Sequence, residues 1–328
     1  MRRLAALLVG VLASFPAAAQ SPLPELAPFA VTPAITGNET AFLDEVLALV
    51  PPGWRVERDA FGSIILREAA GAGGEKDVPV RRLVAVGVDE PGYVVSQIRD
   101  DGWLRVRFIG RSAPAGFHLA REGRPVTVLT RDGPVAGVFL VNSVHFRSPR
   151  PEVIGEEHLF LDVGADSPQD VDALGIELLD AVAAREIVRL SDGRVAGPSL
   201  GTRAATLALL SVLRNGPPAV VGAGAQRGLA FAFVAQSVPA AGARAGDPGP
   251  LGRGGEGVLR RLQPEKALVL RAGRALTDAV SGPTPIGDQH LGYAALELRV
   301  GNADSPVETV APQDLQAFIK AVSAEVWK

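Results

Sequence analysis

Residues 82–88 read Arg-Leu-Val-Ala-Val-Gly-Val, a run that is apolar throughout after its first residue. A strand that is apolar on both faces is typical of the interior of an α/β sheet, where helices cover both sides. Three further apolar runs are candidate central strands: 218–221, 229–234 and 267–270. Apolar residues at helical spacing predict helices over 39–50, 204–214 and 312–328. The pattern predicts an α/β fold.

The sequence pattern changes shortly after residue 88. Short β-rich runs are separated by Asp-Asp-Gly, Arg-Glu-Gly and Arg-Asp-Gly turns, at 93–98, 103–109, 125–129 and 135–144. Short strands at close spacing are typical of a small barrel or sandwich. The sequence therefore predicts an inserted β domain over 89–164, within an α/β domain formed by 20–88 and 165–328. Residues 240–257, rich in Gly, Ala, Pro and Arg, are interpreted as a flexible loop.

Composition excludes several classes of function. The chain has 328 residues, with 33 Lys and Arg against 36 Asp and Glu, so its bulk charge does not favour a nucleic-acid partner. Cysteine is absent, which excludes disulfides, cysteine-ligated metals and a cysteine nucleophile. Any metal site must use Asp, Glu or one of the four histidines, which are His118, His145, His158 and His290.

The first residues have the pattern of an export signal. Two arginines follow Met1, residues 4–12 are almost wholly apolar, and three alanines end at Ala19. Ser14 and Pro16 interrupt the run well before the roughly 20 residues that a membrane span needs. We expect a signal peptide over 1–19, a periplasmic or secreted protein, and no membrane span.

Three ordered segments together resemble a known family. They read Asp-Glu-Pro-Gly-Tyr-Val-Val at 89–95, Glu-His-Leu-Phe-Leu-Asp-Val-Gly-Ala at 157–165 and Asp-Ser-Pro-Val-Glu at 304–308. In this order the segments are similar to the glutamyl and deblocking aminopeptidases, the di-zinc enzymes that include the tetrahedral aminopeptidases and endoglucanase M proteins. The resemblance covers roughly residues 28–325. It implies a mixed central sheet flanked by helices, and a small inserted all-β barrel that covers the cleft and helps subunits assemble into a homo-oligomer.

The family's chemistry can be compared with this chain position by position. In the family an aspartate bridges two zinc or cobalt ions, His and carboxylates complete the ligand set, and a glutamate acts as general base. The resemblance places other residues at these positions: Gly87, Gly201, Ser237, Val238, Arg271 and Asp304. Only Asp304 could still bind a cation, and one carboxylate does not make a catalytic zinc site. We therefore expect no catalytic residue, no metal ligand and no cofactor, with Asp89 and Asp304 as the residual candidates.

The remaining polar candidates favour structural roles. In the family Asp89 would orient the histidine that Gly87 replaces, so we expect a structural carboxylate. The four histidines are interpreted as solvated or hydrogen-bonded structural residues. Ser199 or Ser237 as a nucleophile would need a histidine base, and no nucleophile-elbow motif is present.

These observations lead to one functional hypothesis and two alternatives. We expect an exported relative of the aminopeptidases that has lost zinc binding and hydrolysis and that binds a peptide or protein through the former cleft. The first alternative is an active hydrolase with a rebuilt site that uses Asp89, Asp304 or His158. The second is a structural subunit that assembles with an active paralogue.

Overall fold

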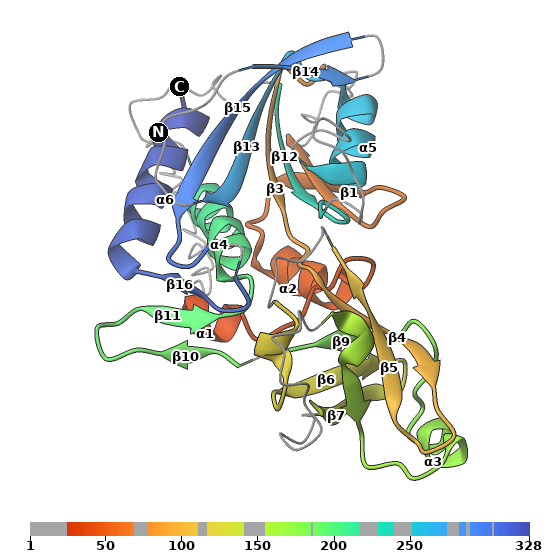
Figure 1. Ribbon diagram of the computed structural model, residues 1–328. Helices are drawn as coiled ribbons and strands as arrows, with labels where there is room; N and C mark the ends of the chain where they lie inside the picture. The colour runs from red at the N-terminus through yellow and green to blue at the C-terminus, as the bar shows by residue number, and fades with distance from the viewer. Residues whose placement is uncertain are drawn as a thin grey trace, which may run out of the picture.

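The computed structural model describes residues 25–68, 78–110, 117–140, 155–184, 186–216, 228–238, 251–273, 282–286, 289–303 and 305–328. The expected signal peptide, the expected strand at 218–221, His145 and Asp304 lie outside these residues. A layered sheet and a separate closed barrel are connected through the chain after residue 87 (Figure 1). Within the described residues, no helix is long and apolar enough to cross a membrane.

The larger unit is built on a seven-stranded mixed sheet. Its order is β1 (Trp54–Arg58), β2 (Ile64–Glu68), β12 (Leu229–Val234), β3 (Arg82–Gly87), β13 (Lys266–Gly273), β15 (Gln289–Arg299) and β14 (Gly282–Ile286). The four strands β12, β3, β13 and β15 run parallel, and antiparallel partners lie on both sides of them. The predicted α/β fold with a mixed central sheet is confirmed.

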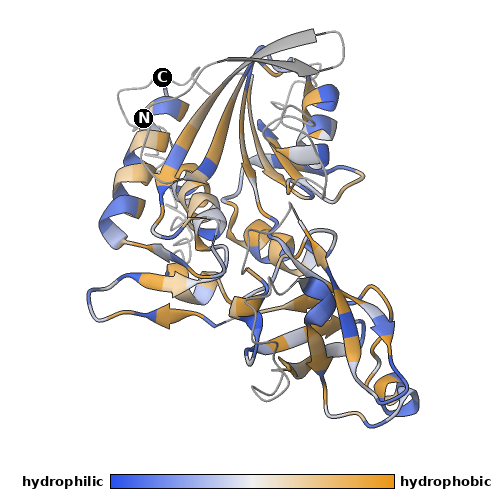
Figure 2. Ribbon diagram, viewed as in Figure 1, coloured by the Kyte–Doolittle hydropathy of each residue, from blue (hydrophilic) through white to orange (hydrophobic). Residues whose placement is uncertain are grey.

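Helices cover both faces of this sheet, as the apolar run at 82–88 required. Alternate β3 residues point to opposite sides: Val84 and Val86 pack in one core and Leu83 and Ala85 in the other. The first face carries α1 (Leu26–Phe29), α2 (Thr40–Leu49), α4 (Leu200–Asn215) and α6 (Pro312–Val326). The second carries α5 (Gly252–Leu262). Figure 2 shows the resulting apolar colour along β3 and β12.

Helix α5 corrects the interpretation of 240–257 as a flexible loop. Residues 252–257 are helical, although glycine lowers helix propensity. A Cβ on Gly254 would overlap the carbonyl oxygen of Ala235, at the end of β12. The glycine therefore permits close contact between helix and strand, and tertiary packing outweighs local propensity.

The smaller unit is a closed barrel of six strands, ordered β4 (Gly92–Ile98), β5 (Leu104–Ile109), β8 (Phe160–Asp162), β7 (Gly133–Phe139), β6 (Pro125–Thr130) and β9 (Ala181–Ala183). Strand β9 closes the barrel by pairing with both β4 and β6. The boundary expected at residue 164 thus falls before a strand that belongs to the barrel. Between these strands the chain forms η1 (Leu119–Arg121), η3 (Glu156–His158) and α3 (Pro168–Ala173).

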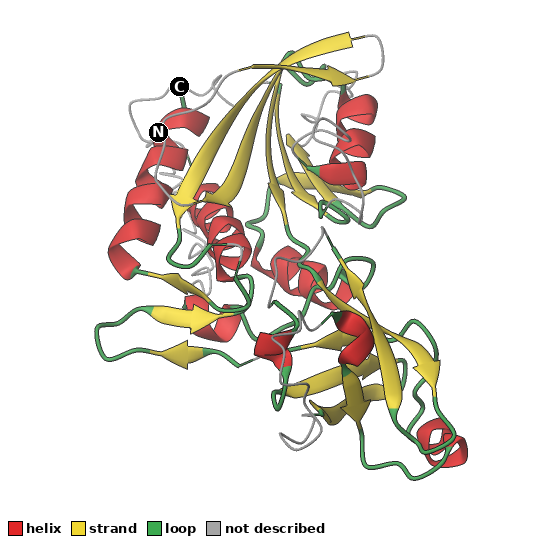
Figure 3. Ribbon diagram, viewed as in Figure 1, coloured by secondary structure: helices red, strands yellow, loops and turns green. Residues whose placement is uncertain are grey.

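A third, three-stranded sheet lies beside the α1 and α4 helices (Figure 3). It consists of β10 (Val188–Arg189), β11 (Val195–Gly197) and β16 (Glu308–Val310). Pairing of β11 with β16 brings the segment before α4 next to the segment before α6. This arrangement positions Glu308 against the first turn of α4.

Candidate functional site

The candidate site lies at the carboxyl ends of β3 and β12. Ligands of open α/β sheets are commonly bound at this edge, where loops leave the strands. Here β3 continues through Val88 to Asp89 and Glu90, and β12 continues through residues 235–238. The structure therefore brings together the predicted positions Gly87, Asp89, Ser237 and Val238.

The carboxylate of Asp89 is buried, and its hydrogen bonds come from three residues. One oxygen accepts from the Ser237 amide at 2.7 Å and from the Ser237 hydroxyl. The other accepts from the Val238 amide at 3.0 Å and from the Thr36 hydroxyl at 2.8 Å. Four hydrogen-bond donors therefore surround this carboxylate without a metal. Asp89 therefore anchors the segment 236–238, called here the 236–238 loop.

The space beside Gly87 is occupied by Ser237. A Cβ on Gly87 would overlap the Ser237 hydroxyl oxygen and lie 2.7 Å from Ser237 Cβ. Real Cβ atoms do not approach this closely. A histidine at position 87, as the family resemblance would require, cannot coexist with the present position of Ser237.

Glu39 is a second carboxylate that holds the 236–238 loop. Its Oε1 atom accepts hydrogen bonds from the Gly37 and Gln236 amides, both at 2.9 Å. Gln236 has φ +50°, a left-handed conformation that is uncommon for a residue with a side chain. Burial raises the pKa of Glu39 above 4.5, and the nearby charge of Asp89 adds to the increase. Two carboxylates thus fix one strained loop.

A buried ion pair lies just beyond Asp89, and sequence reasoning did not find it. Arg203, fully buried in α4, donates to Glu90 Oε1 at 3.1 Å and to the Val88 carbonyl at 3.0 Å. Its guanidinium carbon lies 3.8 Å from the centre of the Phe42 ring, a cation–π contact. Glu90 also accepts from the Ala34 amide at 3.0 Å. The available signal was an arginine directly before the mostly apolar residues 204–210 of this helix.

The predicted position Gly201 is equally enclosed. A Cβ there would overlap Ala272 Cβ and lie 3.0 Å from Val300 Cγ2. The Gly201 amide donates to Glu308 Oε2 at 2.9 Å, which uses one of the amides that the start of α4 leaves without a helical partner. The first turn of α4 is therefore packed against the ends of β13 and β15, with no space for a longer residue.

Other predicted candidates lie apart from Asp89. Arg271 is half-exposed and forms an ion pair with Glu297. His158 is exposed on η3, with Nε2 3.5 Å from Glu157. His118 belongs to the barrel, where its Nδ1 lies 2.8 Å from the Tyr93 hydroxyl and burial lowers its pKa. Ser199 precedes α4 in a left-handed conformation, and no described contact joins it to a histidine.

A two-metal centre needs several ligands close together. A catalytic zinc needs three protein ligands at about 2.0–2.3 Å. Across the described ranges, no group of three or more His, Asp or Glu side chains is close enough together to hold a metal ion. The described residues at this edge therefore do not fit a pair of metal ions, and no chemical step through such ions is derived from them.

Comparison with known proteins identifies the family. Residues 62–223 match the model of the M42 glutamyl aminopeptidases. The SgcX protein of Escherichia coli K12, named as an aminopeptidase, is 30% identical over 186 residues, which are 55% of this chain and 47% of that protein. The chain belongs to the M42 aminopeptidase family. It spans about half the length of this curated relative.

Solved structures share the M42 fold over most of the chain. The TET1 peptidase of Pyrococcus horikoshii matches with a TM-score of 0.72 and 21% identity, over 92% of this chain and 98% of that one. The aminopeptidase APDkam598 of Desulfurococcus kamchatkensis matches with a TM-score of 0.72 and 20% identity, over 92% and 93%. At this identity the likeness concerns the fold.

Membership of the M42 family corrects one expectation. The sequence led us to expect a protein without a cofactor, but members of this family use zinc or cobalt ions. The expectation that the protein takes no cofactor is therefore wrong. The position of Asp304, the last candidate ligand, lies outside the described residues.

Proposed function

We propose that this M42-family protein binds a peptide or protein and does not hydrolyse peptide bonds at the carboxyl edge of its sheet. The observation that carries the proposal is the use of Asp89 to anchor the 236–238 loop. Through that anchor, Ser237 occupies the space beside Gly87. A carboxylate committed to four donors is not available to orient a ligand or to accept a proton from water.

The residues of the loop support the same proposal. Hydrolysis in a co-catalytic metal site needs a general base that takes a proton from the attacking water. Ser237 and Val238 stand where the family resemblance places the base and its neighbour, and neither has a side chain of suitable basicity. Binding of a peptide requires neither a base nor a bridging carboxylate.

A hydrolysis assay tests the proposal. The purified protein is incubated with a panel of aminoacyl p-nitroanilides and free peptides, with added zinc or cobalt, beside the lysyl aminopeptidase of Pyrococcus furiosus as the positive control. We expect no product above the blank without enzyme. Metal-dependent turnover that a chelator abolishes would contradict the proposal. Bound metal is measured by plasma mass spectrometry on the same samples. This shows whether any turnover rate increases with the amount of bound metal.

A binding assay tests the positive half of the proposal. Fluorescein-labelled random peptides are titrated with the protein, and anisotropy is recorded for the wild type and for Asp89→Asn. Saturable binding by the wild type, altered by the substitution, supports a peptide site at this edge. If neither saturable binding nor turnover is detected, the proposal that this edge of the sheet binds a peptide is wrong.

Export is a further part of the proposal and rests on residues 1–19. Two arginines, an apolar run and three alanines form the three regions that signal peptidase substrates share. We expect protein expressed from the full sequence and recovered from the periplasm or medium to begin at Gln20, as read by N-terminal sequencing. An intact Met1 in the recovered protein would contradict cleavage.

Self-assembly is a second candidate role, supported by a structural neighbour. The TET1 peptidase of Pyrococcus horikoshii can assemble into a tetrahedron or a large octahedral shell. We propose a homo-oligomer for this chain as well. Light scattering coupled to size-exclusion chromatography tests this directly, since the mass of a monomer, at most the 34.1 kDa of the full sequence, would contradict it.

A further inference from the structure

The segment 117–121, which contains η1, packs on aromatic side chains of the barrel. Phe117 is 8% exposed, and its ring centre lies 5.4 Å from that of Phe108 in β5. The His118 ring meets both Phe108 and Tyr93 of β4 edge to face. Aromatic contacts of this kind are favourable beyond the area they bury. They hold the 117–121 segment on the barrel.

One hydrogen bond joins this segment to a buried hydroxyl group. The hydroxyl of Tyr93, a residue 3% exposed, lies 2.8 Å from Nδ1 of the half-buried His118. The Tyr93 oxygen also accepts from the Arg121 guanidinium, so its own proton points to Nδ1. Only a neutral histidine can accept there, because a protonated ring carries a proton on both nitrogens. Protonation of His118 would therefore turn the acceptor into a donor and leave the phenol proton without its partner.

Arg121 brings a buried positive charge to the same place. The residue is 9% exposed, and its guanidinium carbon lies 5.2 Å from the centre of the Phe117 ring. Its Nε atom has no hydrogen-bond partner among the residues that the structure describes. Burial lowers the pKa of Arg121 below its usual range, which shows that the charge is incompletely compensated. A second positive charge on His118 would add repulsion at this position.

The charged groups around His118 act in both directions. Two carboxylates of η3, Glu156 and Glu157, favour its protonated form, whereas Arg121 opposes it. Glu156 is already bonded to Arg107, at 3.1 Å. Burial is the largest effect, and the pKa of His118 lies below 6.5. The titratable and charged groups that face the ring are Tyr93, Arg121, Glu156 and Glu157.

We propose that protonation of His118 releases the 117–121 segment from the barrel, so that this contact is a pH-sensitive latch. Release loses the burial of Phe117, but it returns the Arg121 guanidinium to water, which offsets part of that loss.

The direction of the pH dependence follows from the two states. In the released state His118 has the ordinary pKa of 6.5, and in the held state its pKa is lower because the ring is buried. The released state therefore binds the proton more tightly. The latch is fully held above pH 6.5 and weakens as the pH falls from 6.5 to the lower, held-state pKa. The latch belongs to the barrel and does not depend on the function proposed for the sheet edge.

Hydrogen exchange of the full protein measures the release. The amides of Arg121 and Gly123 donate to the carbonyls of His118 and Phe139, so they are protected while the segment is held. Exchange of residues 117–124 is followed by mass spectrometry at about pH 7.5 and about pH 5.5, on either side of the ordinary histidine pKa. Each rate is divided by the rate of an unstructured chain at that pH. We expect protection to fall at the lower pH. The loss should approach about tenfold for each unit by which the pKa of His118, measured by NMR, lies below 6.5.

Two histidine variants separate the latch from general effects of pH. His118→Asn keeps an acceptor near the position of Nδ1 but does not titrate, so protection of the 117–121 segment should be the same at both pH values. His158→Asn removes an exposed histidine of η3 and is the matched control, which should keep the wild-type response. Tyr93→Phe gives a second test in case His118→Asn does not fold. Loss of the hydroxyl donor should raise the pKa of His118 and move release to higher pH.

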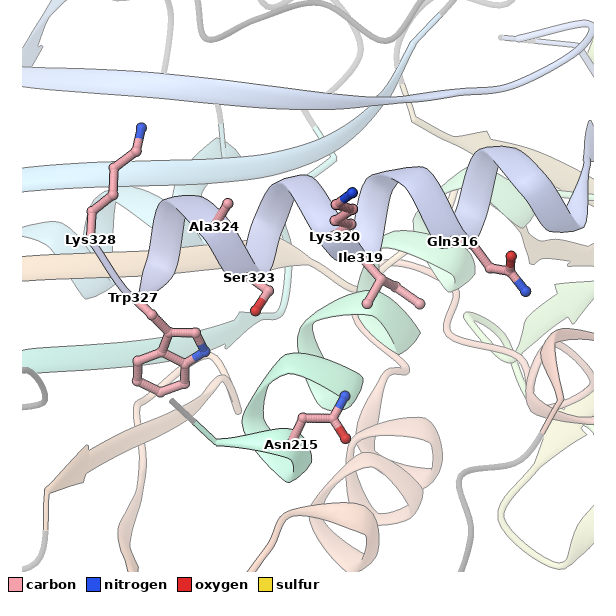
Figure 4. A pocket seen from close by; sticks show the side chains of 8 residues that line it. All are labelled: Asn215, Gln316, Ile319, Lys320, Ser323, Ala324, Trp327 and Lys328. Carbon is pink, nitrogen blue, oxygen red and sulfur yellow. The ribbon is translucent and has the colours of Figure 1, made fainter. Parts of the chain in front are cut away.

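Tryptophan indole signals of ¹⁵N-labelled protein show whether the loss of protection is local. Trp103 packs against Phe160 on the barrel. Trp327 lies at the end of α6 (Figure 4), and its ring packs against Phe231 of the sheet. Both signals should keep their positions at the two pH values.

Three results would overturn the proposal. The first is equal protection of the 117–121 segment at both pH values in the wild type. The second is a wild-type response in His118→Asn. The third is loss of the native Trp103 signal at the lower pH, because the whole barrel would then unfold rather than release one segment.

Discussion

Asp89 accepts hydrogen bonds from both the amide and the hydroxyl of Ser237, a residue 148 positions away in the sequence. Strands β3 and β12 are parallel neighbours, so the residues that follow them meet at one edge. The side chain of Ser237 then occupies the place beside Gly87. Asp89 and Ser237 are thus joined by hydrogen bonds, and Gly87 lies against the Ser237 side chain.

The overlap between Gly87 and Ser237 predicts a non-additive pair of substitutions. Gly87→Ala should destabilise the protein by about 1–3 kcal/mol, because the new Cβ meets Ser237 in a packed region. Ser237→Gly removes the obstructing side chain, although it also removes one hydrogen bond to Asp89. In the double variant we expect a coupling energy of about 1 kcal/mol or more, measured by urea unfolding of all four proteins. Additive effects would show that the two positions do not compete for space.

Loss of charge at Asp89 should destabilise the 236–238 loop. Asp89→Asn replaces one acceptor with an N–H₂ group that faces other donors, so at least one buried amide loses its partner. We expect a loss of about 2–4 kcal/mol in the free energy of unfolding. Asp100→Asn, at an exposed turn, is the matched control and should change stability by less than about 0.5 kcal/mol. Equal effects of the two substitutions would rule out an anchoring role.

The buried pair of Arg203 and Glu90 should be intolerant of losing one partner. Arg203→Met leaves the Glu90 carboxylate without its cation in a buried environment, at a cost of about 3–5 kcal/mol. Adding Glu90→Gln should recover part of this loss, because the remaining charge is removed. The half-exposed pair of Arg271 and Glu297 serves as comparison, and Arg271→Met should cost about 0–1 kcal/mol. Chemical unfolding curves of the wild type and the three variants test this order.

Glu39 predicts a specific dependence of stability on pH. Its folded-state pKa is raised above 4.5 by burial, so the folded protein binds the proton more tightly than the unfolded chain does. Stability should therefore decrease as pH rises through the window that begins at 4.5 and ends at the raised pKa. This contribution is absent from Glu39→Gln. The difference in unfolding free energy between wild type and variant should change across that window and be constant above it. A flat difference throughout would exclude a raised pKa.

The sequence alone accounted for the α/β class with its inserted barrel and for the family. Apolar runs such as 82–88 and 229–234 are local signals of buried strands, and both became central strands of the mixed sheet. Local patterns were less informative at residues 252–257, where glycines that suggested a loop form the first turns of α5. The reason is that Gly254 meets the end of β12, and this contact depends on packing between distant segments.

The identity of Gly87 and Gly201 is enough to state that these positions carry no side chain that can bind a metal. Tertiary structure alone showed that both positions are also filled by neighbours, Ser237 in one case and Ala272 in the other. It also brought Glu39 and Asp89 to the same loop and placed Arg203 against Glu90. Hydrophobic periodicity reports the environment of each segment, whereas these contacts depend on strand order and on the register of segments far apart in the chain.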